Sequence, residues 1–164
     1  MDNLHALKHY KKSILKNAET LLAGRKDGRY LVKNITIEVD HLIREAWRLT
    51  TKDNFGAVDI VATGGYGRSE LSPHSDWDLL ILVPEKVDNK TKRIITKFTQ
   101  LIWDVGGNLG HSVRSIKDAK KFFNINHHAR TAFLEARLLI GNGVLFNSLW
   151  STEKPQVWDI KKRK

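Results

Sequence analysis

The sequence predicts an α+β (α/β) domain in which a small mixed sheet follows two N-terminal helices. Apolar residues recur at helical spacing over residues 4–50. From residue 57 onward the apolar runs become short and end at glycine or proline, which is typical of strands. Helical periodicity then returns between and after these short runs, so strands and helices are expected to share one core.

The N-terminal part is predicted to form two amphipathic helices. Residues 4–24 carry leucine, isoleucine and alanine at helical spacing and end at Gly24, a helix stop signal. Residues 29–50 repeat the pattern, and residues 51–56 (TKDNFG) give the expected boundary. We therefore predict three parts: a helical arm over residues 1–52, a core over residues 53–150 and a basic C-terminal tail over residues 151–164.

Three strands are predicted in the core. Residues 57–65 form a short apolar run that ends in two glycines. Residues 76–83 (DWDLLILV) are apolar on both faces and stop at Pro84, as in a strand that is covered on both sides. Residues 108–115 are the third predicted strand.

The remaining elements of the core are predicted to be helices. Residues 89–107 place apolar side chains on one side and end in glycines. Ser115 followed by Asp118 is typical of a helix cap, so a short helix is expected to begin there. Residues 129–143 (ARTAFLEARLLIGNG) are predicted as one helix with a glycine stop, and residues 144–150 as a last turn or two.

Composition narrows the class of protein. The formal net charge of +10 and the pI of about 9.9 favour anionic partners such as nucleotides, while the absence of cysteine excludes disulfides and cysteine zinc sites. Nucleic acid is not an expected partner, since no basic strand is interleaved with aromatic residues. The polar N-terminus has no signal-peptide pattern, and no apolar run reaches the ~18 residues of a membrane span. We expect a soluble, cytoplasmic protein without a membrane partner.

The candidate functional residues lie between the first two predicted strands and at the start of the second. Two familiar phosphate-binding patterns are excluded: the dinucleotide fingerprint lacks its third glycine, because Glu70 stands there, and the P-loop lacks its lysine, because Arg68 follows Gly67. What remains is a Gly-Gly pair followed by D-x-D at the start of a strand.

Asp76 and Asp78 are two residues apart, so on a strand they would project from the same face. Like charges so close repel unless a cation lies between them, and Mg²⁺ commonly takes one or two carboxylates plus substrate phosphates. Gly64 and Gly65 would let the backbone approach a phosphate, and Arg68 could add a bidentate contact. A lone D-x-D is more often a solvated strand entry; the preceding glycine pair makes a Mg²⁺ and triphosphate site the better interpretation.

The stretch GGYGRSELSPHSDWDLLIL resembles the signature of the N-terminal nucleotidyltransferase domain of bacterial PII-protein uridylyltransferases, which are bifunctional uridylyltransferase/uridylyl-removing enzymes. That domain belongs to the DNA polymerase β-type nucleotidyltransferase superfamily, so the resemblance implies a polymerase β-like core. It continues in LIWDVGGNLGHSVRS, in TAFLEARLLIGN, which is a helix in the family, and in the helical lead-in LLAGRKDGRYLVKNITIEVDHLIREAW. These linked motifs cover most of residues 15–150.

The resemblance implies transfer of UMP from UTP to a tyrosine hydroxyl of the PII nitrogen-regulatory protein, with release of pyrophosphate. It implies that Gly64 and Gly65 hold the triphosphate. It also implies that Asp76 and Asp78 are catalytic and bind Mg²⁺. UTP and PII are thus the expected substrate and partner, and Mg²⁺ the expected cofactor.

Several positions depart from the family pattern or leave alternatives open. Ser69 replaces a glycine, and Asn126 replaces an acidic residue. No third carboxylate stands on the strand after the long helix, where His111 is the nearest titratable group; it is either structural or catalytic. Arg68 is a triphosphate candidate on charge grounds. Glu70 orients Arg68, caps the short helix after the glycines, or forms a structural salt bridge.

Three functions remain open. The chain is a uridylyltransferase domain, a nucleotidyltransferase with another target, or a degenerate domain that binds nucleotide or a partner without turnover. The family's UMP-removing and glutamine-sensing domains do not occur in these 164 residues. We therefore expect the chain alone to be a weak transferase.

Overall fold

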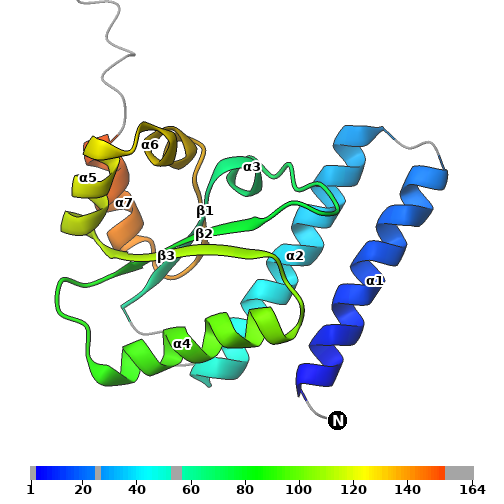
Figure 1. Ribbon diagram of the computed structural model, residues 1–164, viewed down its shortest axis with the longest axis horizontal. Helices are drawn as coiled ribbons and strands as arrows, with labels where there is room; N and C mark the ends of the chain where they lie inside the picture. The colour runs from blue at the N-terminus through cyan, green and yellow to red at the C-terminus, as the bar shows by residue number, and fades with distance from the viewer. Residues whose placement is uncertain (1–2, 25–26, 53–56, 154–164) are drawn as a thin grey trace, which may run out of the picture.

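The computed structural model describes residues 3–24, 27–52 and 57–153, which form seven helices and one four-stranded sheet (Figure 1). The helices are α1 (Asn3–Ala23), α2 (Gly28–Thr51), α3 (Gly64–Gly67), α4 (Asn89–Asp104), α5 (Ile116–Ile125), α6 (His127–Leu134) and α7 (Val144–Glu153). The strands are β1 (Asp59–Ala62), β2 (Trp77–Val83), β3 (Leu109–Ser115) and β4 (Arg137–Ile140). The α+β class with a small mixed sheet is confirmed.

The sheet has the strand order β3-β2-β1-β4. β1 runs antiparallel to β2 and to β4, whereas β2 and β3 are parallel. The parallel pair needs a crossover, which α4 provides between β2 and β3. This register sets Asp78 of β2 directly beside Gly110 of β3, a pairing on which the candidate site depends.

Both faces of the sheet are covered, and each face has its own apolar core. Leu79 and Ile81 of β2 belong to a large core shared with α1, α2 and α4. Leu80 and Leu82 alternate to the other face and pack in a smaller core against α5, α6 and α7. Figure 1 shows α5, α6 and α7 grouped away from α4, with the sheet between them. The prediction that β2 is buried on both faces is confirmed.

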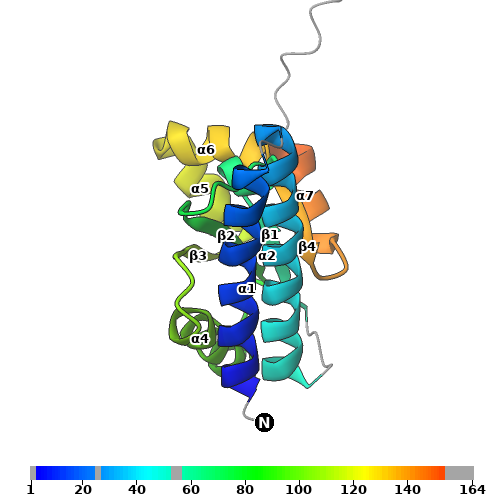
Figure 2. The same ribbon diagram turned by 90° about the vertical axis from the view of Figure 1, so that its right-hand side faces the viewer.

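The two N-terminal helices are confirmed as α1 and α2. Figure 2 shows them side by side along the sheet, and they contact each other. Side chains from both helices enter the larger core together with strand residues. The expected boundary at residues 51–56 falls largely on residues 53–56, which lie outside the described residues, as does most of the expected tail.

The prediction of one helix over residues 129–143 is wrong in its second half. Helix α6 ends at Leu134, and Arg137–Ile140 form β4, paired with β1 so that Leu138 lies opposite Val61. A continuous apolar run fits a buried strand as well as a helix, and the ladder with β1 decides between them. The helix expected in the family motif TAFLEARLLIGN is therefore a helix followed by an edge strand.

The last helix is longer than expected. Instead of a turn or two, α7 spans Val144–Glu153 and so extends into the first residues of the expected tail. Among the described residues, no helix combines the length and apolar character that a membrane crossing requires.

Candidate active site

The Asp78 carboxylate lies between two glycines from different elements. A Cβ added to Gly110 would lie 2.5 Å from Asp78 Oδ1, so only glycine leaves room for the carboxylate at that position of β3. On the other side, a Cβ on Gly64 would lie 3.8 Å from Asp78 Oδ2. Asp78 thus reaches the glycine turn from the neighbouring strand, and its carboxylate stands beside backbone rather than side chains.

Asp76 lies next to Asp78 but outside the strand. β2 begins at Trp77, whose buried ring points to the larger core while both aspartates stay accessible to solvent. Partial burial raises the pKa of the Asp78 carboxyl, and the nearby Asp76 charge raises it further. This repulsion between two carboxylates is the electrostatic setting that a bound cation would relieve.

The Gly-Gly pair opens α3, a short helical turn directly after β1. Gly64 has φ +58°, a left-handed conformation that favours glycine, and the Thr63 N–H donates to Asp78 O at 3.0 Å. The first N–H groups of a helical turn have no partner within it, so those of Gly64 and Gly65 are free of intrahelical bonds. The turn therefore presents backbone donors beside the Asp78 carboxylate.

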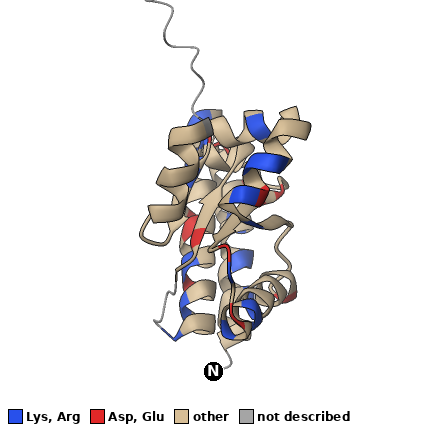
Figure 3. Ribbon diagram, turned by 90° about the vertical axis from the view of Figure 1, so that its left-hand side faces the viewer, with Lys and Arg blue, Asp and Glu red and all other residues tan. Residues whose placement is uncertain are grey.

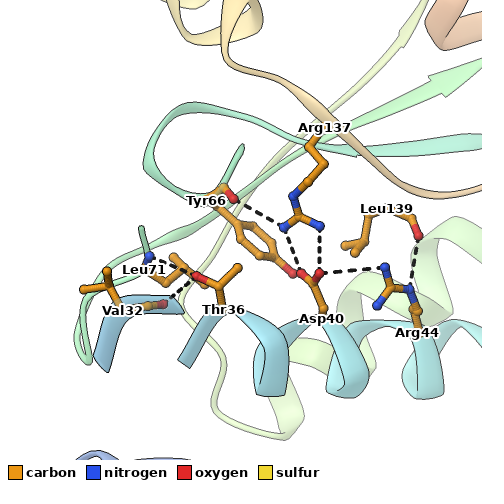
Figure 4. A network of polar contacts seen from close by, with 8 residues as sticks. All are labelled: Val32, Thr36, Asp40, Arg44, Tyr66, Leu71, Arg137 and Leu139. Atoms are coloured by element: carbon orange, nitrogen blue, oxygen red, sulfur yellow. Dashed lines mark hydrogen bonds and ion pairs between the residues drawn. The ribbon is translucent and has the colours of Figure 1, made fainter. Parts of the chain in front are cut away.

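A polar network behind the turn ties it to α2 and β4 (Figure 4). Arg137 donates to both Asp40 oxygens at 2.7 and 3.0 Å, and to Tyr66 O of α3 at 3.4 Å. Burial and the adjacent Asp40 carboxylate raise the pKa of Tyr66 well above its ordinary value, which keeps the hydroxyl neutral. The arginine fork thus connects the helical arm, the glycine turn and the edge strand in one cluster.

Sequence reasoning missed this network. Asp40 and Arg137 are 97 positions apart and belong to unrelated segments of the pattern. The one available signal was Asp40 itself, a carboxylate on the otherwise apolar side of a predicted helix, where an unpaired charge would be costly.

Arg68 is held by two carboxylates. Its Nε donates to Glu70 at 2.7 Å, and its Nη1 pairs with Glu135 at the end of α6. These contacts raise the pKa of Arg68, with the Glu70 hydrogen bond as the largest cause. Of the alternatives for Glu70, a contact with Arg68 is present, as both orientation of Arg68 and a salt bridge require. Nε and Nη1 of Arg68 are paired, whereas Nη2 lies 3.7 Å from the position of a Cβ on Gly65 and so faces the glycine turn.

Ser69 has φ +62°, the left-handed region that a side chain disfavours. This explains physically why a glycine suits the position. We expect Ser69→Gly to raise the free energy of unfolding by about 0.5–1 kcal/mol, the left-handed strain of serine less the backbone entropy of glycine. Urea unfolding titrations of the unaltered chain and of Ser69→Gly measure this difference in the free energy of unfolding. A lower urea midpoint for Ser69→Gly would contradict the claim that Ser69 is strained.

His111 lies on the other face of the sheet from Asp78. It is the next residue after Gly110 on β3, so its side chain alternates away, and its ring contacts Trp103 of α4 with centroids 5.5 Å apart. Among the described residues no group of three or more His, Asp or Glu side chains is arranged to hold a metal ion. The described part of the chain thus brings Asp76 and Asp78 together without a third carboxylate.

Next to Asp78 a cavity of about 430 Å³ opens between the sheet and the helices α5 and α6. Asn126 lines it and also caps α6, accepting from Ala129 N–H at 2.9 Å. The other lining residues come from the end of β1, from β2, β3, α5 and α6: Thr63, Asp78, Leu79, Leu80, Gly110, His111, Ser112, Arg114, Phe122, Phe123, His128, Ala129, Ala132 and Phe133. In the view of Figure 3, Lys and Arg occur on several separate elements instead of one continuous stripe.

Comparison with known proteins agrees with this geometry. The profile of the nucleotidyltransferase domain matches residues 45–138, from within α2 to within β4. Three similar relatives are named "Bifunctional uridylyltransferase/uridylyl-removing enzyme". The one from Cupriavidus metallidurans is 45% identical over 73% of this chain and 14% of its own length. Those from Methylococcus capsulatus and Pseudomonas putida are 39% and 31% identical over 77% and 93% of this chain, and 14% and 17% of their own lengths.

The matched segment contains the glycine turn, both aspartates, Gly110 and the first two residues of β4. This chain spans only 14% to 17% of the length of those three relatives. The chain therefore belongs to the nucleotidyltransferase domain family and is a homologue of the bifunctional uridylyltransferase/uridylyl-removing enzymes.

Proposed function

We propose that this domain binds UTP with Mg²⁺ and transfers UMP to a tyrosine hydroxyl of a PII-type regulatory protein. The observation that carries the proposal is the position of Asp78, whose carboxylate lies between the glycine turn and Gly110 with Asp76 beside it. This arrangement joins oxygen ligands for a hard cation to backbone donors for phosphate. UTP as donor and PII as acceptor follow from the family resemblance and are part of the proposal.

The residues present fit Mg²⁺. Asp76 and Asp78 are hard oxygen ligands, they repel each other, and the substrate's phosphates would complete the coordination. When bound, Mg²⁺ would neutralise charge on the phosphates and favour displacement at the α-phosphorus. The two carboxylates would hold the cation, and the donors of Gly64 and Gly65 would orient the phosphate chain.

The acceptor side of the reaction is less complete. A tyrosine hydroxyl must lose its proton while it attacks, and general-base help is worth about 10²–10⁴-fold. Among the described residues, no third carboxylate is grouped with the two aspartates, and the side chain of His111 alternates to the other face of β3. We therefore expect slow transfer by this chain alone.

Incorporation of label from [α-³²P]UTP into PII, in the presence of Mg²⁺, ATP and 2-oxoglutarate, tests the proposal. We expect slow labelling of the PII tyrosine that disappears with EDTA. A PII variant in which that tyrosine is phenylalanine is the matched control. Labelling of that variant to the same extent would contradict a tyrosine acceptor.

A second candidate is a nucleotide-binding domain without turnover, which the lack of a third acidic ligand among the described residues favours. Binding of Mg·UTP without any labelling of PII, under conditions where a full-length relative labels it, would select this candidate. Binding of Mg·UTP and labelling of PII, measured together, therefore distinguish a transferase from a nucleotide-binding domain without turnover.

Gly65→Ala distinguishes a phosphate cradle from a plain turn. Gly65 has no left-handed φ, and an added Cβ would meet only Arg68 Nη2 at 3.7 Å and Glu70 O at 3.9 Å. The free protein should thus accept alanine, while a bound phosphate should not. We expect an unchanged unfolding midpoint and an affinity for Mg·UTP lower by at least about tenfold, or about 1.4 kcal/mol. Calorimetry that gives equal affinities would remove Gly65 from the site.

A further inference from the structure

Arg114 of β3 lies on the same face of the sheet as Asp78. Gly110 is the register partner of Asp78, and Ser112 and Arg114 follow it at alternate positions of the same strand. Asp78 and Arg114 both line the cavity of about 430 Å³. Arg114 is four positions after Gly110 on the strand, which places their backbones about 13 Å apart. The cavity therefore extends from the candidate Mg²⁺ and phosphate end to Arg114.

The Arg114 guanidinium is positioned but unpaired. Its central carbon lies 3.6 Å from the centroid of the Phe122 ring of α5, a cation–π contact that holds the guanidinium against the ring. Its Nε is buried and has no hydrogen-bond partner among the described residues. Arg68, by contrast, is engaged by two carboxylates. Arg114 is thus an arginine of the cavity lining whose Nε has no acceptor among the described residues.

We infer that Arg114, supported by Phe122, recognises the nucleobase of the bound nucleoside triphosphate through the 4-keto oxygen of uracil. The inference rests on the proposed function, which places the phosphates at the Asp78 end and so turns the base toward the other end. A guanidinium offers donors only, so the base edge that it meets must present acceptors. Uracil has a keto oxygen where cytosine has an amino group, and an amino group facing Arg114 would leave two donors opposed.

The test is Mg²⁺-dependent binding of UTP, CTP and inorganic triphosphate to the 164-residue chain, measured by calorimetry. We expect the unaltered chain to prefer UTP over CTP by at least about tenfold, because an unpaired donor is costly in a site built to form that bond. Arg114→Gln, whose amide can turn either way, should lose most of this preference. It should bind triphosphate as the unaltered chain does.

Two further variants keep the result interpretable. Arg114→Met keeps an apolar side chain of similar length but has no donor, and should also lose the base preference, even if Arg114→Gln folds poorly. Lys121→Gln removes one positive charge from an exposed position of α5 outside the cavity lining, and should change nothing. Thermal unfolding of each variant reports whether the fold is kept.

Each outcome has one meaning. Equal losses for UTP and triphosphate in the Arg114 variants would show that Arg114 contacts phosphate and would overturn the inference. An unchanged preference of the Arg114 variants for UTP over CTP would overturn the inference as well. If these variants still bind triphosphate, the proposed function is not contradicted. A chain that binds neither UTP nor triphosphate contradicts the proposed function itself, and the inference with it.

Discussion

The double variant Asp76→Asn, Asp78→Asn is expected to lose Mg²⁺-dependent binding of UTP while keeping its fold. The two carboxylates repel each other, and partial burial raises the pKa of Asp78, so the free protein holds these charges at a cost. Asparagine has a similar shape and removes both charges. Stability should therefore stay the same or rise, whereas the affinity for Mg·UTP should fall more than about a hundredfold, or about 2.7 kcal/mol.

Calorimetric titration with Mg·UTP and thermal unfolding measure the two effects on the same samples. The variant Glu19→Gln, Asp104→Asn is a matched control, because it makes the same change of net charge at two exposed positions on α1 and α4. That control should bind as the unaltered chain does. A double aspartate variant that binds Mg·UTP with full affinity would refute the metal site, and one that unfolds would show that the pair is structural.

The sequence predicted those features that depend on local periodicity. Helices α1, α2, α4 and α5 each place apolar residues on one side within a short window, and caps or stops mark their ends. The Ser115 cap is an example: its side chain accepts from the Asp118 N–H at 3.2 Å, as the two residue types predict. Such signals require no knowledge of distant contacts.

The edge strand β4 was missed because its identity depends on a distant partner. Leu138, Leu139 and Ile140 fit a helix and a buried strand equally well, and only pairing with β1 makes them a strand. The Asp40–Arg137 pair has the same origin, since the strand must form before Arg137 can reach α2. Both features are non-local, and the sequence contains no signal for them beyond the unexplained carboxylate of Asp40 on the apolar side of α2.

The candidate site likewise combines residues that a local sequence pattern indicates with residues that only the fold brings together. Gly64, Asp76 and Asp78 could be selected from the sequence because a glycine pair after one strand and D-x-D at the start of the next together indicate a phosphate and cation site, although neither does so alone. Gly110 could not be selected, because its importance comes from the register of two strands separated by α4. Arg114 was likewise an ordinary strand residue until the register placed it in the Asp78 cavity.

Gly110→Ala is expected to disable the site without unfolding the protein. The added Cβ would lie 2.5 Å from Asp78 Oδ1, so the carboxylate must move away. The clash is with the end of a side chain, the Asp78 Cα lies 4.0 Å away, and Gly110 has no left-handed φ. Rotation of Asp78 can therefore relieve the overlap at little cost in stability. The same rotation removes the carboxylate from its place between the glycine turn and β3.

A displacement of about 1 Å in a catalytic arrangement can reduce turnover about a hundredfold, and we expect a loss of UMP transfer of that size in Gly110→Ala. Label transfer to PII, Mg·UTP affinity and the unfolding midpoint should be measured together. Gly28→Ala is the matched control, since a Cβ there meets no atom within 4 Å. Full transfer by Gly110→Ala would mean that the site tolerates a moved Asp78, because the overlap itself cannot be avoided. In that case Asp76 would have to be the carboxylate on which the reaction depends.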